Sequence, residues 1–155
     1  MTYEIERTTL EPELTAAITV TCPWDAISQQ MGPIFGEVMA YLGPIGAIAG
    51  DAKAFGRYTP AGENVILEAG FTVHAPITGH GRVQPGTLPG GDAVVTMHEG
   101  AYDTVPQAYE AMQTWMVERH LAGAASMWEY YLTPPDVQPP RTMIVWPLVA
   151  TPVTA

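Results

Sequence analysis

Hydrophobic and polar positions along this chain follow two periods, that of a strand and that of a helix, in successive segments. Residues 3–8 alternate at every second position, which is typical of a half-buried strand. After a Pro-bearing turn, residues 14–21 are rich in small and β-branched apolar types and predict a second strand. From about residue 26 to residue 42 the apolar spacing becomes helical. We expect a kink or a broken first turn at Pro33, and the end of this helix at Gly43-Pro44.

The same succession continues to the end of the chain. Residues 52–58 and 65–73 predict a strand pair around a turn, and a tight Pro-Gly turn at 88–91 leads into a strand at 91–98. Thr104 and Gln107 have the spacing of a capping box that starts a second helix. Its apolar stripe comprises Val105, Ala108, Tyr109, Met112, Trp115 and Met116. Two further strands are predicted at 127–132 and 142–148.

These elements describe a duplication. Each strand-like run is followed by an aromatic residue and an aspartate, Trp24-Asp25 in one half and Tyr102-Asp103 in the other, and then by a helical run. The pattern predicts an α+β fold of two ββαββ units, with an internal repeat of 1–74 and 81–150 inside a single domain of residues 1–155. The groove between two such units is the expected ligand site.

Charge excludes several classes of partner. The 155 residues contain six Lys and Arg and carry a formal net charge of −10. Nucleic-acid binding needs basic side chains that replace phosphate counterions, and an anionic membrane surface needs them too. No secretory signal and no apolar run of roughly 20 residues is present, so we expect a cytoplasmic protein. The sequence leaves monomer and dimer open, because a sheet edge can pair.

Metal and cofactor motifs are missing from the sequence. The only cysteine, Cys22, ends an apolar run and is expected to be a buried, inert thiol. None of the four histidines has metal-ligand spacing with a second ligand. The chain has no phosphate-binding glycine loop, no dinucleotide fingerprint and no serine-nucleophile elbow. We therefore expect neither a metal nor a cofactor.

Six phrases, in this order, resemble the GyrI-like (gyrase-inhibitor-like) small-molecule-binding domains, which include effector-binding domains of AraC-type and MerR-type regulators. They are residues 54–58, 68–73, 88–91, 98–103, 108–115 and 128–132. The resemblance implies a duplicated SHS2-type module, with two helices on a curved antiparallel sheet and a hydrophobic groove for lipophilic, often cationic, molecules. It also places a glutamate of a Trp/Phe-Glu-x-Tyr pattern in the pocket. The matching residues are Glu129 and Tyr131.

Glu129 is the leading candidate on its own pattern as well. In an extended strand Glu129 and Tyr131 point to one face, and a carboxylate among Met, Trp and Tyr is costly to bury unless it is used or paired. The alternative is that this face is exposed to solvent. In an apolar pocket Glu129 would pair with a cation or act as a general acid or base, with a raised pKa.

Other residues are expected to complete the groove. Glu68 shares a strand with apolar neighbours and faces either the groove or solvent; in the groove it would form a carboxylate pair with Glu129. Flat aromatic faces hold lipophilic cations, at roughly 0.5–2 kcal/mol per ring. The expected aromatic lining is Trp24, Tyr41, Phe71, Tyr102 and Trp146.

Three functions remain open at this point. The first is a stand-alone protein that binds or sequesters lipophilic, cationic or polycyclic molecules, as multidrug-binding domains do. The second, implied by the resemblance, is a hydrolase that opens strained, cyclopropane-bearing natural products with Glu129 and Tyr131. The third is an inhibitor that binds a protein partner through its acidic surface.

Overall fold

The chain adopts an α+β fold in which strands and helices alternate as the sequence predicts. The structure, a computed structural model, describes residues 3–47, 52–133 and 139–149. Its strands are β1 (Ile5–Leu10), β2 (Glu13–Pro23), β3 (Ala54–Ala61), β4 (Asn64–Thr72), β5 (Gln84–Leu88), β6 (Gly91–Glu99), β7 (Met127–Tyr131) and β8 (Arg141–Pro147). The main helices are α1 (Ile27–Ile45) and α2 (Val105–Glu118), each preceded by a 3-10 turn, η1 (Trp24–Ala26) and η2 (Tyr102–Thr104).

The chain divides into two compact units. The N-terminal unit is Glu11–Gly90, and the C-terminal unit combines Met1–Leu10 with Gly91–Ala155. The order strand, helix, strand, strand occurs once in each unit, as β2-α1-β3-β4 and as β6-α2-β7-β8.

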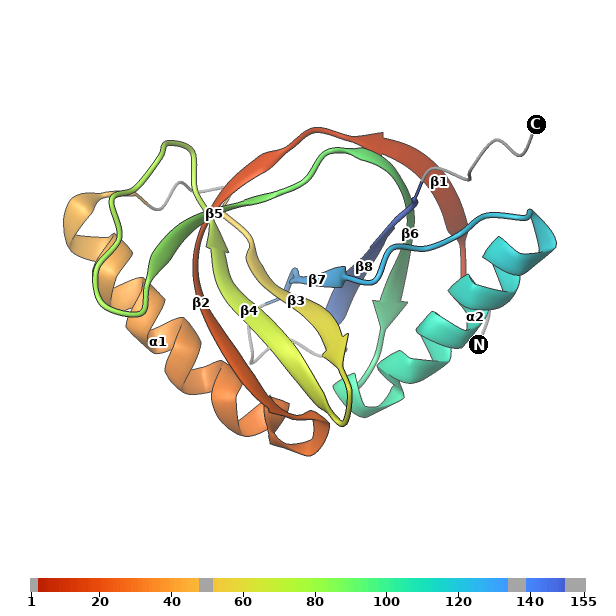
Figure 1. Cartoon of the computed structure of the whole chain (residues 1–155), viewed down its shortest axis with the longest axis horizontal. Helices are drawn as coiled ribbons and strands as arrows, with labels where there is room; N and C mark the ends of the chain where they lie inside the picture. The colour runs from red at the N-terminus through yellow and green to blue at the C-terminus, as the bar shows by residue number, and fades with distance from the viewer. Residues whose placement is uncertain (1–2, 48–51, 134–138, 150–155) are drawn as a thin grey trace. The chain divides into compact units, whose positions relative to one another are not determined.

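The N-terminal unit contains four antiparallel strands in the order β3-β4-β2-β5, with α1 packed on β2 and β4 (Figure 1). Pairing of Ile18 with Ala69 and of Val20 with Leu67 places these apolar side chains on one face of the strands. The buried residues Ile34, Val38 and Leu42 of α1 cover that face. The apolar alternation of β2 and β4 is thus the signal that directs α1 onto them.

Helix α1 continues through Pro33, so the broken turn that the sequence analysis allowed there does not form. It is continuous from Ile27 to Ile45 and contains both Pro33 and Pro44. It ends at Gly46, which has φ of 64° and donates its N–H to the carbonyl of Gly43. A glycine in the left-handed conformation is a common helix end, so Gly46 and not Gly43-Pro44 sets the boundary.

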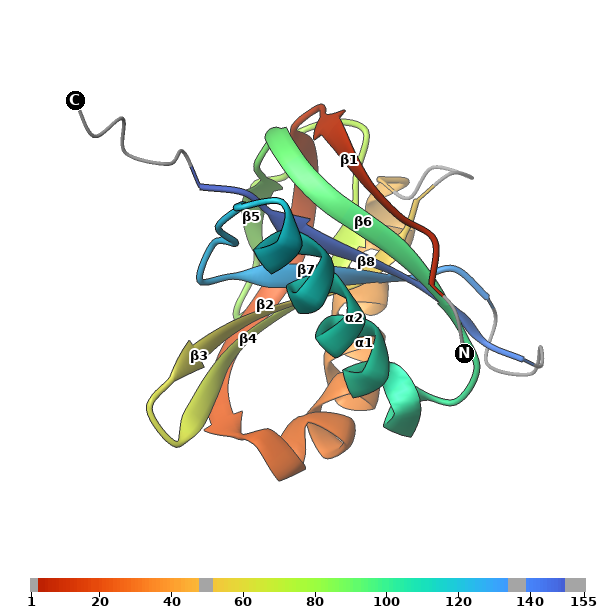
Figure 2. The same cartoon turned by 90° about the vertical axis from the view of Figure 1, so that its right-hand side faces the viewer.

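The C-terminal unit contains four antiparallel strands in the order β1-β6-β8-β7. Figure 2 shows α2 lying over the strands of this unit. Buried side chains of α2, among them Ala108 and Met112, form a core with Val94 of β6 and Ile144 of β8. This packing defines the α2-facing side of the unit, on which the candidate site lies.

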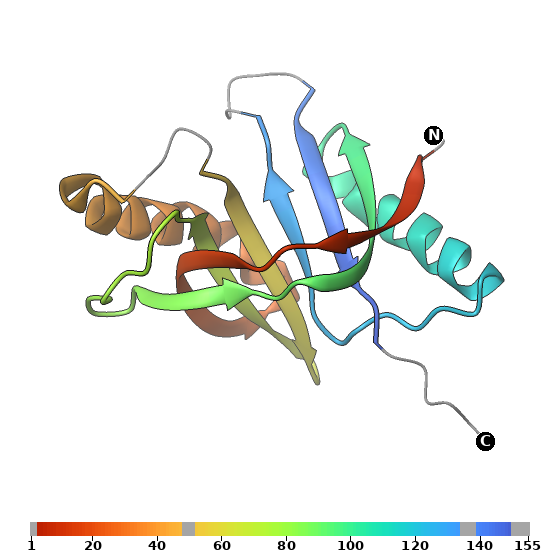
Figure 3. The same cartoon turned by 90° about the horizontal axis from the view of Figure 1, so that it is seen from above.

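Strand pairing groups the edge strands differently from the predicted repeat. The repeat boundaries 1–74 and 81–150 assign β1 to the first half and β5 to the second. In the structure β1 pairs with β6, and β5 pairs with β2, as Figure 3 shows. A period-2 pattern predicts that a segment is a strand, but it does not identify the strand's partner.

Candidate functional site

Glu129 occupies the centre of β7 and faces α2. It pairs with Ile144, which pairs in turn with Thr96, and directly paired residues of antiparallel strands share a face. Because Ile144 belongs to the core beneath α2, the side chain of Glu129 is on the same side. Glu129 is only 8 % exposed. The alternative of a solvent-exposed face is therefore excluded for this carboxylate.

Two tyrosine hydroxyls hold the carboxylate. Tyr109 of α2 donates its hydroxyl to Oε2 of Glu129 at 2.6 Å, and Tyr131 of β7 donates to Oε1 at 3.2 Å. Within the described residues no Lys, Arg or His forms an ion pair with Glu129. A buried carboxylate that has two neutral donors and forms no ion pair is suited to receive a cation from outside the chain.

Burial raises the pKa of Glu129 above its usual value of 4.5, because an apolar environment disfavours the charged form. Hydrogen bonds from Tyr109 and Tyr131 and the nearby His98 act in the opposite direction and lower that pKa, with smaller effects than burial. Burial thus favours the protonated carboxyl group of Glu129, and three neighbouring groups favour its ionised form.

Aromatic rings frame the two tyrosines. Trp146 of β8 makes an edge contact with Tyr109 at 6.0 Å between ring centroids, and its indole Nε1 donates to the carbonyl of Ala124 at 3.0 Å. Tyr102 of η2 makes an edge contact with Tyr131 at 5.9 Å. Tyr102 is 51 % exposed. Rings therefore lead from the surface at Tyr102 inward to the carboxylate.

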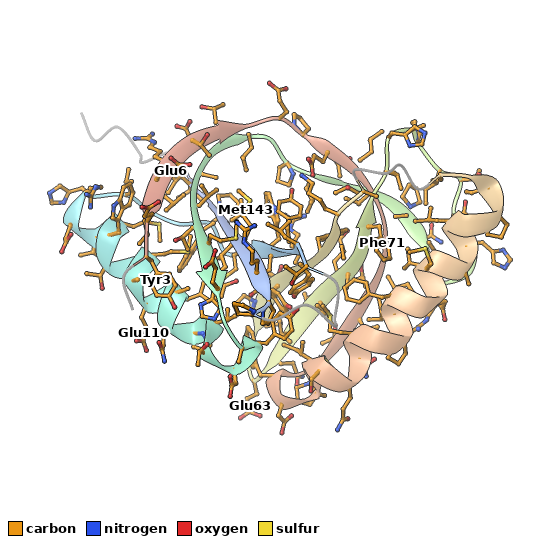
Figure 4. The ribbon with its side chains drawn as sticks, turned by 180° about the vertical axis from the view of Figure 1, so that it is seen from behind. Tyr3, Glu6, Glu63, Phe71, Glu110 and Met143 are labelled. Atoms are coloured by element: carbon orange, nitrogen blue, oxygen red, sulfur yellow. The ribbon has the colours of Figure 1, made fainter. Side chains whose placement is uncertain are left out.

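A buried histidine fixes the turn that carries Tyr102. His98 is fully buried, stacks on Tyr3 (labelled in Figure 4), and its Nδ1 lies 2.9 Å from the Tyr3 hydroxyl. Its Nε2 lies 2.9 Å from Oγ1 of Thr104. Since Thr104 donates its own proton to the carbonyl of Ala101, its oxygen accepts from Nε2–H of His98. Thr104 makes no side-chain bond that caps α2, so the predicted capping box does not form.

With this geometry established, comparison with known proteins identifies the family. The sequence model of the GyrI-like small molecule binding domain matches residues 1–149. The chain belongs to the GyrI-like family. This confirms the resemblance seen in the sequence, and small-molecule binding is the function that family membership supports. No curated protein sequence matches the chain significantly.

Several solved structures share the GyrI-like fold. The EcmrR C-terminal domain has a TM-score of 0.82 and 19 % identity, over 97 % of this chain and 100 % of that one. A hydrolase encoded by lin2189 of Listeria innocua has a TM-score of 0.66 and 14 % identity, over 94 % and 92 %. SAV2435 bound to tetraphenylphosphonium has a TM-score of 0.60 and 19 % identity, over 94 % of both chains.

Four of the predicted site residues of this GyrI-like chain lie together in the C-terminal unit, namely Glu129, Tyr131, Tyr102 and Trp146. The sequence analysis assigned Tyr109 to the apolar stripe of α2 and did not predict it as a site residue. The available signal was its phenol hydroxyl, which needs a hydrogen-bond partner once the ring is buried. Which partner it finds depends on the packing of α2 over β7.

The other four predicted residues lie in the N-terminal unit. Phe71 packs against Phe35 of α1 at 5.6 Å between centroids and is labelled in Figure 4. Trp24 is 47 % exposed in η1. The hydroxyl of Tyr41 accepts the N–H of Gly79 at 3.0 Å. Tyr41 lines an open hollow of about 680 Å³ with the ion pair Glu37–Arg82.

Glu68 does not occupy the position in its unit that corresponds to Glu129, and the expected carboxylate pair stays a prediction. Its neighbours Leu67 and Ala69 lie in the core under α1, so Glu68 points to the opposite face of its strands. There it lies 3.8 Å from Arg57, and its pKa is raised by burial and lowered by Arg57. The strand that matches β7 is β3, where Gly56 stands two residues before Tyr58 as Glu129 stands two before Tyr131.

The described residues contain no group of three or more His, Cys, Asp or Glu side chains that could hold a metal ion. Among those residues, no helix is both long and apolar enough to cross a membrane.

Replacing Glu129 by Gln should change how stability depends on pH. The raised pKa means that protonated Glu129 stabilises the fold fully below pH 4.5, and that this contribution is lost as pH rises through the folded-state pKa. Glutamine cannot ionise. The unfolding free energy of Glu129→Gln relative to that of wild type should therefore increase as pH rises from 4.5 to the folded-state pKa, and the difference should be constant above it. Urea unfolding between pH 4 and pH 8 measures this difference. Glu63→Gln, in an exposed turn, controls for the loss of one formal charge; an equal gain there would contradict the prediction.

Proposed function

We propose that this GyrI-like domain binds lipophilic organic cations at the Glu129 site of its C-terminal unit. The observation that carries the proposal is the buried carboxylate, which has two tyrosine donors and forms no ion pair among the described residues. A bound cation would supply the missing counter-charge in a low-dielectric environment, where the attraction is strongest. Tyr102, Tyr109 and Trp146 would offer rings to a flat or aryl-substituted ligand.

Access requires movement of the covering side chains, because Glu129 is 8 % exposed. Tyr102 is the exposed member of the cluster and contacts Tyr131, whose hydroxyl reaches the carboxylate. Displacement of these two rings would open a route from solvent to the carboxylate. The ligand would then replace a tyrosine donor at Glu129 with its own positive charge.

Two probes of nearly the same shape and opposite charge test the proposal. SAV2435, a structural relative, is bound to tetraphenylphosphonium in its solved structure, which makes that cation a reasonable first probe. Tetraphenylborate carries the same four phenyl groups and a negative charge. Calorimetry should show binding of the cation to wild type and much weaker binding of the anion. Glu129→Gln should lower cation affinity by about ten- to a hundredfold, or roughly 1.4–2.8 kcal/mol. Equal affinity of wild type and Glu129→Gln for the cation would contradict the proposal.

A hydrolase is the second candidate, favoured by the contact of 2.6 Å between the Tyr109 hydroxyl and a carboxyl group of raised pKa. A structural relative from Listeria innocua is described as a hydrolase. Here Glu129 would take a proton from an attacking water while Tyr131 protonates the leaving group, and the proton would then return from Glu129 to Tyr131 through their hydrogen bond, so that the product is the substrate plus one water. Mass spectrometry of every bound compound after incubation separates the two functions, because a binding protein returns its ligand unchanged.

A further inference from the structure

Thr142 lies within the same polar row as the Glu129 site. It is fully buried on β8, where it pairs with His98 of β6 on one side and with Tyr131 of β7 on the other. Paired residues share a face, so its side chain is on the α2-facing side together with those of His98 and Tyr131. The row is polar, although apolar core residues such as Val94 and Ile144 share this face.

The hydroxyl of Thr142 differs from its polar neighbours because it has no hydrogen-bond partner among the described residues. His98 has its Nδ1 on Tyr3 and its Nε2 on Thr104, and Glu129 accepts from two tyrosines. Thr96, on the same face of β6, donates its hydroxyl to the carbonyl of Glu4 at 2.7 Å. A buried hydroxyl that makes no hydrogen bond destabilises the fold. Its presence beside the Glu129 site therefore indicates a functional role.

We propose that Thr142 is a specificity-determining residue of the Glu129 site, whose hydroxyl binds a polar group of the ligand. The preferred ligand is then a lipophilic cation that also carries a hydroxyl or another hydrogen-bonding group. This inference rests on the proposed function, since it takes Glu129 as the anchor of the positive charge.

The sheet register sets the distance between Glu129 and Thr142, the two residues that would anchor the ligand. Glu129 pairs with Ile144, so Thr142 is its diagonal neighbour on the adjacent strand. Diagonal neighbours of an antiparallel pair lie about 7–8 Å apart. The polar group of the ligand should therefore lie on the far side of a phenyl ring from the cationic centre. Displacement of the rings that cover Glu129 would expose Thr142 as well, because both belong to one face of two adjacent strands.

The unliganded protein provides the first test. Thr142→Val keeps the shape of the side chain and removes the hydroxyl, so unfolding of this variant in urea should occur at the wild-type denaturant concentration or a higher one. Thr96→Val is the matched control: it removes a hydroxyl that is bonded, and it should unfold at a lower concentration. A loss in Thr142→Val equal to that in Thr96→Val would mean that the Thr142 hydroxyl is already satisfied, and would overturn the inference.

Binding provides the second test, with tetraphenylphosphonium and (4-hydroxyphenyl)triphenylphosphonium as probes. Wild type should bind the hydroxyl probe about five- to tenfold more tightly, as one hydrogen bond made in a buried site predicts. This advantage should vanish in Thr142→Val and return in Thr142→Ser.

The outcomes separate this inference from the proposed function. If both probes require Glu129 and Thr142→Val retains the full preference for the hydroxyl probe, the assignment of Thr142 is wrong and cation binding stands. If neither probe binds, or binding is unaffected by Glu129→Gln, the proposed function is wrong and the assignment of Thr142 is overturned with it.

Discussion

Gly70→Ala is expected to destabilise the N-terminal unit by about 3 kcal/mol or more, the upper end for overpacking a core. Gly70 lies in β4 between Ala17 of β2 and Phe55 of β3. A Cβ at this position would overlap the carbonyl oxygen of Ala16 and lie 2.8 Å from the Cα of Ala17. Both are backbone atoms of a central strand, so the clash can be relieved only by separating the strands. Urea unfolding followed by circular dichroism measures the loss.

Gly36→Ala is the matched control for this substitution. A Cβ at Gly36 meets no atom within 4 Å, and the residue lies on the exposed side of α1. Alanine is favoured over glycine inside a helix by roughly 0.5–1 kcal/mol, so this variant should be as stable as wild type or more stable. If Gly70→Ala were no less stable than Gly36→Ala, the close approach of β4 to β2 would be contradicted.

Gly123→Ala is expected to reduce both stability and cation binding. A Cβ at Gly123 would overlap the indole Nε1 of Trp146 and lie 2.7 Å from its Cε2. The indole must then move, which breaks its hydrogen bond to Ala124 and disturbs its contact with Tyr109, the donor to Glu129. We expect a loss of about 1–3 kcal/mol in unfolding free energy, as is usual for overpacking. Binding of tetraphenylphosphonium should weaken in the same variant.

A double-mutant cycle isolates the cause of that loss. Trp146→Ala removes the indole that Gly123→Ala would strike, so the alanine at position 123 should cost much less stability in the Trp146→Ala background than in wild type. Additive losses in the double variant would show that Gly123 acts without Trp146. In that case Gly123 would not influence the Glu129 site through Trp146 and Tyr109.

The pair Glu129 and Tyr131 could be predicted from the sequence because both belong to one strand. Side chains two apart on a strand share a face whatever the strand packs against. The same period placed Glu68 opposite its apolar neighbours, but it could not say which face of those strands α1 covers. Packing of α1 on Leu67 and Ala69 decided that, and it separated Glu68 from the position that matches Glu129.

The hydrogen-bond partners of Tyr109 and His98 could not be predicted from the sequence. Tyr109 is 20 residues from Glu129 along the chain, and Tyr3 is 95 residues from His98. Both hydrogen bonds exist because strands β1, β6, β8 and β7 are neighbours and α2 crosses the same face. A local sequence pattern does not specify which strands are neighbours, because strand order and helix placement depend on the free energy of the whole unit.

The sequence by itself determined the type and order of the elements, the α+β class, the acidic charge and the strand that carries Glu129. These follow from local periodicity and composition, which act within one segment at a time. Only the tertiary structure decided the partner of β1, the burial of Glu129, its bond to Tyr109 and the unpartnered hydroxyl of Thr142. Each of these depends on atoms brought together from distant segments, where the geometry of packing selects one partner among several that the pattern allows.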